Sequence, residues 1–202
     1  MNPIRNNNNG HKENTEKFTV QANADISNGV KLDIGCGNLK KEGYTGVDIL
    51  KLPGVDIACD IQKGLPMVVS NSVDEIHCSM ILEHINDLTT VMREFHRVLK
   101  PSGELIIIVP HCFSEMAFRD PTHCRYFTCR TFKYFDKSHS HSYYHDFHFK
   151  FISSRIKISR EKPSLFDRFL EWFINTNQPR GERLLKIIPY RNWIVHSILK
   201  KE

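Results

Sequence analysis

The most regular hydrophobic pattern in the chain lies between Asp87 and Pro110. Apolar residues recur at helical spacing over 88–99, Asp87 is a suitable N-cap, and the sequence Pro101-Ser102-Gly103 ends the predicted helix. Residues 104–109, with the sequence ELIIIV, form an unbroken apolar run, which is typical of a central parallel strand covered on both faces. Shorter apolar runs bounded by glycine, proline or acidic residues predict further strands at 30–34, 44–49, 56–61 and 74–79.

This succession of elements predicts an α/β fold. We expect a Rossmann-like open sheet, mostly parallel, with helices on both faces and ligands at the carboxyl ends of the strands. After Pro110 the periodicity is irregular, and only two strands, at 149–159 and 192–199, and an amphipathic helix at 165–174 are predicted. Residues 1–16 are polar and Asn-rich, which is typical of a disordered tail, so a single domain is expected over 17–202.

The charges and aromatic residues are distributed unevenly between the two halves of the chain. Residues 1–110 carry 11 Lys+Arg and 14 Asp+Glu, a net charge of −3, whereas residues 111–202 carry 17 and 9, a net charge of +8. The second half also holds 18 of the 21 aromatic residues. A basic, aromatic second half indicates a surface that meets an anionic or flat partner.

The remaining composition indicates a protein of the cytoplasm. No run of 18 apolar residues exists, so no transmembrane segment is predicted, and the first residues lack the apolar core of a signal peptide. Six cysteines at irregular spacing are interpreted as free thiols.

Polar residues at the ends of the first strands indicate a nucleoside site. The turn at Gly35 and Gly37 lets a ligand approach the backbone without a Cβ in the way. Asp48 ends the second strand, where a carboxylate can accept both hydroxyls of a ribose. At the end of the third strand, Asp60 offers an acceptor for an exocyclic amine and Ile61 an apolar contact for a purine.

Five motifs follow one another along residues 30–110: LDIGCG at 32–37, GVDI at 46–49, CDI at 59–61, ILEHI at 81–85 and EFHRVLKPSG at 94–103. In these motifs the chain resembles the class I S-adenosylmethionine-dependent methyltransferases of the small-molecule type. The resemblance implies that S-adenosylmethionine is the cofactor and that residues 30–110 bind it, while 111–202 bind the acceptor. It also implies that Gly35 and Gly37 face the methionine part, that Asp33 is oriented to the amino group and that Ser79 lies beside the cofactor; Asp48 would hold the ribose, and Asp60 with Ile61 the adenine.

Two features depart from the family pattern. Asn38 follows the glycine pair where a small residue is usual, and only residues 38–43 separate the first two strands, so the first helix is expected to have one or two turns at most. The Asn/Asp-Pro-Pro-Tyr/Phe motif of many nucleobase methyltransferases is missing after the fourth strand, which disfavours a nucleic-acid acceptor without excluding it.

The segment after Pro110 carries the candidate catalytic residues. Asp120 and His123 flank Pro121 and could form a carboxylate–imidazole pair that removes a proton from the acceptor. The alternative is a turn that Asp120 caps, with His123 merely polar. His111, at the strand end, is the second candidate for the base.

Two other segments have an ordinary and a functional interpretation. The histidine-rich residues 139–148 lack the usual zinc-ligand spacings, so no metal site is assigned and a solvated or aromatic-stacked loop is favoured. The helix at 165–174 is aromatic on one side with cations nearby, which suits either core packing or peripheral contact with a membrane.

We therefore expect methyl transfer to a hydroxyl or amine of a small, anionic acceptor such as a sugar phosphate or nucleotide sugar. An RNA methyltransferase is the alternative enzyme, because aromatic residues interleaved with Arg and Lys can stack on bases. A non-catalytic protein that binds S-adenosylmethionine is the alternative from another class. The acceptor, the atom methylated and the oligomeric state are left open by the sequence.

Overall fold

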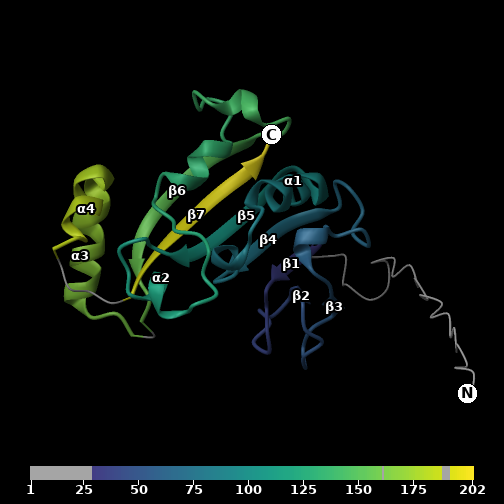
Figure 1. Ribbon diagram of the computed structural model, residues 1–202, viewed down its shortest axis with the longest axis horizontal. Helices are drawn as coiled ribbons and strands as arrows, with labels where there is room; N and C mark the ends of the chain where they lie inside the picture. The colour runs from purple at the N-terminus through teal and green to yellow at the C-terminus, as the bar shows by residue number, and fades with distance from the viewer. Residues whose placement is uncertain (1–28, 161, 188–191) are drawn as a thin grey trace, which may run out of the picture.

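The computed structural model describes residues 29–160, 162–187 and 192–202, and these form a seven-stranded sheet in the order β3-β2-β1-β4-β5-β7-β6 (Figure 1). The first five strands are parallel, and β7 is antiparallel to both β5 and β6. The prediction of a Rossmann-like, mostly parallel open sheet is confirmed. The strands are β1 (Lys31–Ile34), β2 (Thr45–Asp48), β3 (Ile57–Ala58), β4 (Val73–Ser79), β5 (Leu99–Pro110), β6 (Phe149–Ile158) and β7 (Trp193–Lys201).

The helices begin where the sequence supplies caps. Asp87 accepts a hydrogen bond from the Thr90 amide at the start of α1, and Ser164 forms a capping box with Asp167 at the start of α3. Figure 1 places α3 and α4 together beyond β6, at the opposite end of the sheet from β1–β3. The helices are α1 (Leu88–Val98), α2 (Met116–Arg119), α3 (Leu165–Thr176) and α4 (Gln178–Leu184), with short 3-10 helices at Ile61–Lys63, Leu82–His84, Thr131–Phe135 and Ser142–Tyr144.

The crossover between β1 and β2 differs from the prediction in its conformation. The segment between β1 and β2 contains hydrogen-bonded turns, from Leu39 to Cys36 and from Tyr44 to Lys41, and no helix. The expected helix of one or two turns does not form. The ten connecting residues, 35–44, contain two turns instead, and Gly35, Gly37 and Gly43 have positive φ values there. Helices α2 and α4 were not predicted.

The sheet is completely buried on one face only. On β5, Leu105, Ile107 and Val109 are inaccessible to solvent, whereas the alternate residues Ile106 and Ile108 are half-buried. The second face of this strand is therefore covered less completely than the first, and no helix in the described part of the chain connects β1 to β2 or β2 to β3. The strand also begins earlier than predicted, at Leu99, with Pro101-Ser102-Gly103 included in it.

The parallel strands bring the predicted site residues to one edge. Asp48 and Ser79 are the last residues of β2 and β4, and the glycine turn follows β1 directly. Because β1, β2 and β4 are neighbours, these ends lie side by side at the carboxyl edge of the sheet. The predicted tail at 1–16 lies outside the described residues. In the part of the chain that the structure describes, no helix is long and apolar enough to cross a membrane.

Candidate active site

The turn after β1 is held by backbone and carboxylate contacts. Gly35 has φ +70°, and a Cβ there would lie 2.8 Å from the Ile81 side chain, so only glycine fits. Gly37 also has a positive φ, but a Cβ on it would meet no atom within 4 Å, which leaves open space in front of the turn. Asp48 fixes this turn by accepting a hydrogen bond from the Gly37 amide at 2.9 Å.

Asp33 supports the same turn from the opposite face of β1. Its carboxylate accepts a hydrogen bond from the Lys41 amide at 2.9 Å and contacts His77 Nδ1 at 2.8 Å. His77 is its register partner on β4, and Asp33 is buried. Both carboxylate oxygens are thus engaged by protein, and the orientation of Asp33 toward the methionine amino group stays a prediction.

The ends of β3 and β4 present the other predicted cofactor contacts. Asp60 follows β3 and caps the 3-10 helix Ile61–Lys63 by accepting a hydrogen bond from Gln62, while Ile61 is buried. The Cys59 amide donates to the Asp48 carbonyl, which brings Asp60 next to the end of β2. Ser79 is half-buried at the last position of β4.

These residues fit the adenosine and methionine parts of S-adenosylmethionine. The open space at Gly37 allows a ligand to approach the backbone, and Asp48 borders that space with a carboxylate that suits ribose hydroxyls. A glycine turn at a strand's carboxyl end is also where nucleotide-like ligands bind in open α/β sheets.

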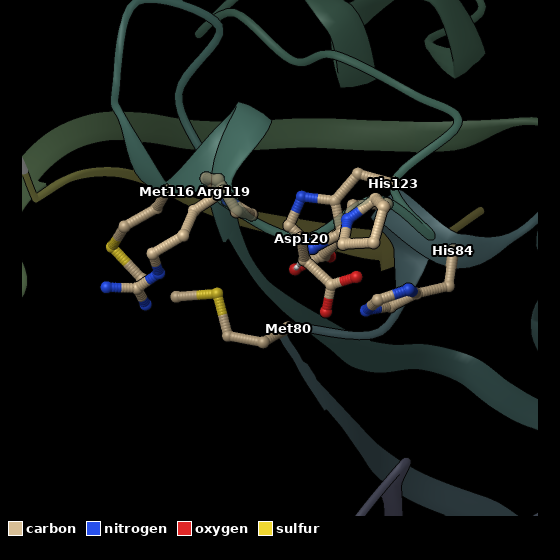
Figure 2. A pocket seen from close by; sticks show the side chains of 9 residues that line it. Met80, His84, Met116, Arg119, Asp120 and His123 are labelled. Carbon is tan, nitrogen blue, oxygen red and sulfur yellow. Dashed lines mark ion pairs between the residues drawn. The ribbon is translucent and has the colours of Figure 1, made fainter.

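A cavity of about 540 Å³ lies beyond the end of β4, where Met80 directly follows Ser79. Figure 2 shows Met80, His84 and Asp120 pointing into one space, with Met116 and Arg119 on the side opposite His84. Six of its nine lining residues come from the segment 110–123, which the sequence predicts to bind the acceptor, and we call it the acceptor cavity after that prediction. The cavity is lined by Met80, Glu83, His84, Pro110, Met116, Arg119, Asp120, Pro121 and His123.

Glu83 and His123 face each other in the wall of this acceptor cavity. Oε1 of Glu83 lies 4.0 Å from Nε2 of His123, and Oε2 of Glu83 is buried without a hydrogen-bond partner. The Nδ1–H of His123 donates to the Ala117 carbonyl at 3.1 Å, so in the neutral ring Nε2 carries the lone pair that faces Glu83. Burial raises the pKa of Glu83 to about 7.

The predicted pairing of Asp120 with His123 is wrong in this structure. Oδ1 of Asp120 accepts hydrogen bonds from the amide and the hydroxyl of Thr122, so Asp120 caps its own turn. Thr122 also contacts Nδ1 of His84 at 2.9 Å, which fixes that ring at the cavity wall. Glu83 was not predicted as a catalytic residue and entered only as part of the motif ILEHI at 81–85; a carboxylate between Leu82 and Ile85 was the available signal.

His111 is not placed as a base. It is fully buried, its Nδ1 accepts a hydrogen bond from the Phe113 amide, and its Nε2 lies 3.4 Å from Glu182. It does not line the acceptor cavity. Its position at the end of β5 suggested a catalytic role, but the strand directs the ring inward, toward α4.

The structure also brings together a set of groups that could hold a metal. The ligand atoms of Glu83, His84 and His123 lie within 4.8 Å of one another. Atoms bound to one Zn²⁺ at about 2.1 Å are roughly 3.4 Å apart, so the 4.0 Å gap between Glu83 and His123 is wider than a tetrahedral site needs. Three of the four histidines of 139–148 instead contact aromatic rings, as His139 and His145 do with Tyr134.

Comparisons with known proteins agree with the fold and with the cofactor half. Residues 32–107 match a family described as "Methyltransferase domain", and no curated protein matches the chain. A SAM-dependent methyltransferase from Archaeoglobus fulgidus has a TM-score of 0.56 at 22% identity, covering 85% of each chain. The YcgJ protein from Bacillus subtilis has a TM-score of 0.51 at 16% identity, covering 86% of this chain and 92% of that chain.

The fold by itself does not define the reaction. The [4+2]-cyclase SpnF shares it, with a TM-score of 0.53 at 17% identity over 86% of this chain and 75% of that one. The family match is more specific, because it spans the glycine turn, Asp48, Asp60 and Ser79, the residues that meet at the carboxyl edge of the sheet. Residues 32–107 are thus similar to a methyltransferase domain, and the described chain has the fold of S-adenosylmethionine-dependent methyltransferases.

Proposed function

We propose that the enzyme methylates a hydroxyl or amine of a small, anionic acceptor, such as a sugar phosphate or nucleotide sugar, held in the acceptor cavity. The cofactor, when bound, supplies a methyl group activated on sulfur. The observation that carries the proposal is the opposed pair of Glu83 and His123 in the wall of a cavity next to the cofactor edge. A neutral nucleophile must lose its proton during the transfer, and this pair is suited to receive it.

In the proposed step, Nε2 of His123 accepts the proton of the acceptor hydroxyl or amine. The Ala117 carbonyl keeps the other ring proton on Nδ1, so the base is presented in one tautomer. Glu83 stabilises the imidazolium that forms, because a carboxylate in a poorly solvated wall interacts strongly with a new positive charge nearby. Asp120 contributes through its charge and not through a hydrogen bond to His123.

Arg119 supports the anionic character of the acceptor. It lines the cavity on the side opposite His84 (Figure 2), and its guanidinium can bind a phosphate or carboxylate through two parallel hydrogen bonds. The basic second half, with a net charge of +8 from 17 Lys+Arg and 9 Asp+Glu, favours the approach of such an acceptor.

The experiment is a screen of phosphorylated and nucleotide sugars with labelled cofactor, followed by kinetics of three variants. His123→Ala is expected to lower kcat by roughly 10² to 10⁴ while cofactor affinity is kept. Arg119→Gln should raise KM for the anionic acceptor with little change in kcat. His141→Ala, the same chemical change at an exposed histidine that does not line the cavity, serves as the matched control and should retain wild-type turnover.

Other outcomes would contradict parts of this proposal. If His123→Ala keeps near-normal turnover, catalysis is by alignment alone. If a chelator abolishes turnover and a divalent metal restores it, Glu83, His84 and His123 bind a metal ion, and His123 is not the general base. Cofactor binding without turnover on any acceptor would support a binding protein.

The RNA alternative rests on exposed aromatic residues beside the cavity. Phe118 and Tyr126 stack at a centroid distance of 4.8 Å, and both are exposed, so a base could extend the stack. RNA that co-purifies with the protein and is released steeply by salt would favour this acceptor. A cytoplasmic location fits either acceptor and stays a prediction.

A further inference from the structure

Helix α3 covers the free edge of the sheet with one face and leaves an apolar face in solvent. On the inner face, Asn175 both donates to and accepts from the Ile156 backbone, and Glu171 accepts from the Ile158 amide, so the helix completes the hydrogen bonds of edge strand β6. Leu170 and Ile174 are buried on this side. The helix is therefore fixed in orientation, and its opposite face is a permanent surface feature.

The outer face consists of five large apolar side chains that are 48–84% exposed. At 100° per residue they fall within an arc of about 120°, which makes one continuous strip along the helix. We call this strip the aromatic face. Its members are Leu165, Phe166, Phe169, Trp172 and Phe173. Scattered exposed apolar residues are normal, but a contiguous strip of this size marks an interaction surface.

The exposed charges on α3, on α4 and in the residues next to them have one sign. Between residues 162 and 187 every exposed charged side chain is a cation, namely Lys162, Arg168, Arg180, Arg183 and Lys186. The three acids of that stretch are turned inward: Asp167 is buried beside Arg160, Glu171 binds the edge strand and Glu182 accepts from the Cys129 amide.

This combination indicates the kind of partner. An aromatic strip that includes Trp, flanked by cations and free of exposed acids, is suited to the headgroup region of a negatively charged bilayer. Arg168 lies about 40° from Trp172 around the helix, so a side chain at the edge of the strip can reach lipid phosphates while the rings insert. A protein partner would be expected to supply acidic side chains opposite these cations. A second copy of this chain does not supply them through the same surface, because no acid between residues 162 and 187 is exposed.

We propose that α3 and α4 dock this methyltransferase on anionic membranes, with the aromatic face inserted at the interface and the cations on lipid phosphates. The inference does not depend on the acceptor. It does place the acceptor site near the membrane, because Lys186 after α4 lies over the ring of Phe113, in the segment that leads from β5 to the acceptor cavity.

The experiment measures sedimentation of the full chain with vesicles of phosphatidylcholine, with or without phosphatidylserine. Binding is expected only when phosphatidylserine is present and should weaken with salt. The fluorescence of exposed Trp172 should shift to the blue on binding, while Trp193 is fully buried and serves as a constant background. The variant Trp172→Phe should remove the shift and retain sedimentation.

Two sets of variants test the surface directly. The double variant Phe166→Ser, Phe169→Ser should weaken vesicle binding at least about tenfold, because two ring insertions are lost, with cofactor affinity unchanged. Exposed apolar residues elsewhere provide the matched control, Leu39→Ser with Val69→Ser, which should bind vesicles like the wild type. Failure of the wild type to bind phosphatidylserine vesicles would overturn the proposal, as would a dimer in light scattering that Phe169→Ser dissociates.

Discussion

The carboxylate of Asp48 accepts a hydrogen bond from the amide of Gly37 over 2.9 Å, which joins the end of β2 to the glycine turn after β1. Its second oxygen accepts from the Leu50 amide at 3.0 Å. The side chain is therefore positioned before any ligand arrives. Each carboxylate oxygen keeps further acceptor capacity, so the same group can support the turn and bind a ribose.

Replacing Asp48 with alanine should weaken binding of S-adenosylmethionine by at least tenfold. The variant loses hydrogen bonds to a charged acceptor, worth about 1.5 to 3 kcal/mol each, and releases the Gly37 amide. Calorimetric titration of the folded variant measures the effect. Asp87→Ala is the control with the same chemical change: it removes the N-cap of α1, at a cost of about 1 kcal/mol, and should leave cofactor affinity intact.

Gly35→Ala should be more damaging than Gly43→Ala. Both glycines have positive φ values, +70° and +77°, and alanine pays about 1 to 2 kcal/mol there. At Gly35 a Cβ would also lie 2.8 Å from Ile81, whereas at Gly43 it would meet nothing within 4 Å. Urea unfolding measures the loss of stability in both variants. The loss in Gly43→Ala reports the cost of the positive φ alone, and the additional loss in Gly35→Ala reports the steric contact with Ile81. Equal losses of stability would show that Ile81 moves aside.

His111→Ala should lower stability and not catalysis. The ring connects Phe113 to Glu182, and although burial raises the pKa of Glu182, hydrogen bonds from His111 and the Cys129 amide bring it below its ordinary value. Truncation leaves a cavity and a buried carboxylate with one partner fewer, at a cost of about 2 kcal/mol or more. Thermal unfolding should show a drop of several degrees, and turnover at low temperature should persist. Loss of turnover without loss of stability would contradict this prediction and would indicate that His111 acts as a general base.

The cofactor half was predictable because each of its signals is local. A short apolar run followed by a glycine turn places Asp48 and Asp60 at strand ends, and parallel pairing alone then brings these ends to one edge. The caps at Asp87 and Ser164 are also local, and Asp87 was identified as one from the sequence. The short helix expected in the first crossover does not form, because turns with positive-φ glycines connect the two strands.

The acceptor half was less predictable because its contacts are long-range. Glu83 and His123 are 40 residues apart, and nothing in the spacing around Pro121 shows that His123 turns away from Asp120. Similarly, the end of β5 identified His111 as a candidate, but its burial depends on Glu182, 71 residues later. Sequence patterns report which residues sit at an edge; side-chain partners across such separations depend on tertiary packing.

The stability of the protein should fall between about pH 5 and pH 7 through Glu83. Burial raises its pKa to about 7 in the folded state, compared with about 4.3 in an unfolded chain. Between these values the folded protein holds a proton that the unfolded chain has released, so the free energy of unfolding decreases as pH rises. Below the unfolded pKa both states are protonated, and the stabilisation is complete; above pH 7 it has been lost.

The variant Glu83→Gln isolates this contribution, because glutamine resembles the protonated carboxyl and does not titrate. The difference in unfolding free energy, variant minus wild type, should grow by about 2 to 3 kcal/mol from pH 5 to pH 8, since each pH unit in this window is worth about 1.4 kcal/mol. Urea unfolding of both proteins at the two pH values measures it, and the other titrating groups cancel in the difference. A difference that does not change with pH would mean that Glu83 ionises as in solvent, and would remove the poorly solvated carboxylate from the proposed proton transfer to His123.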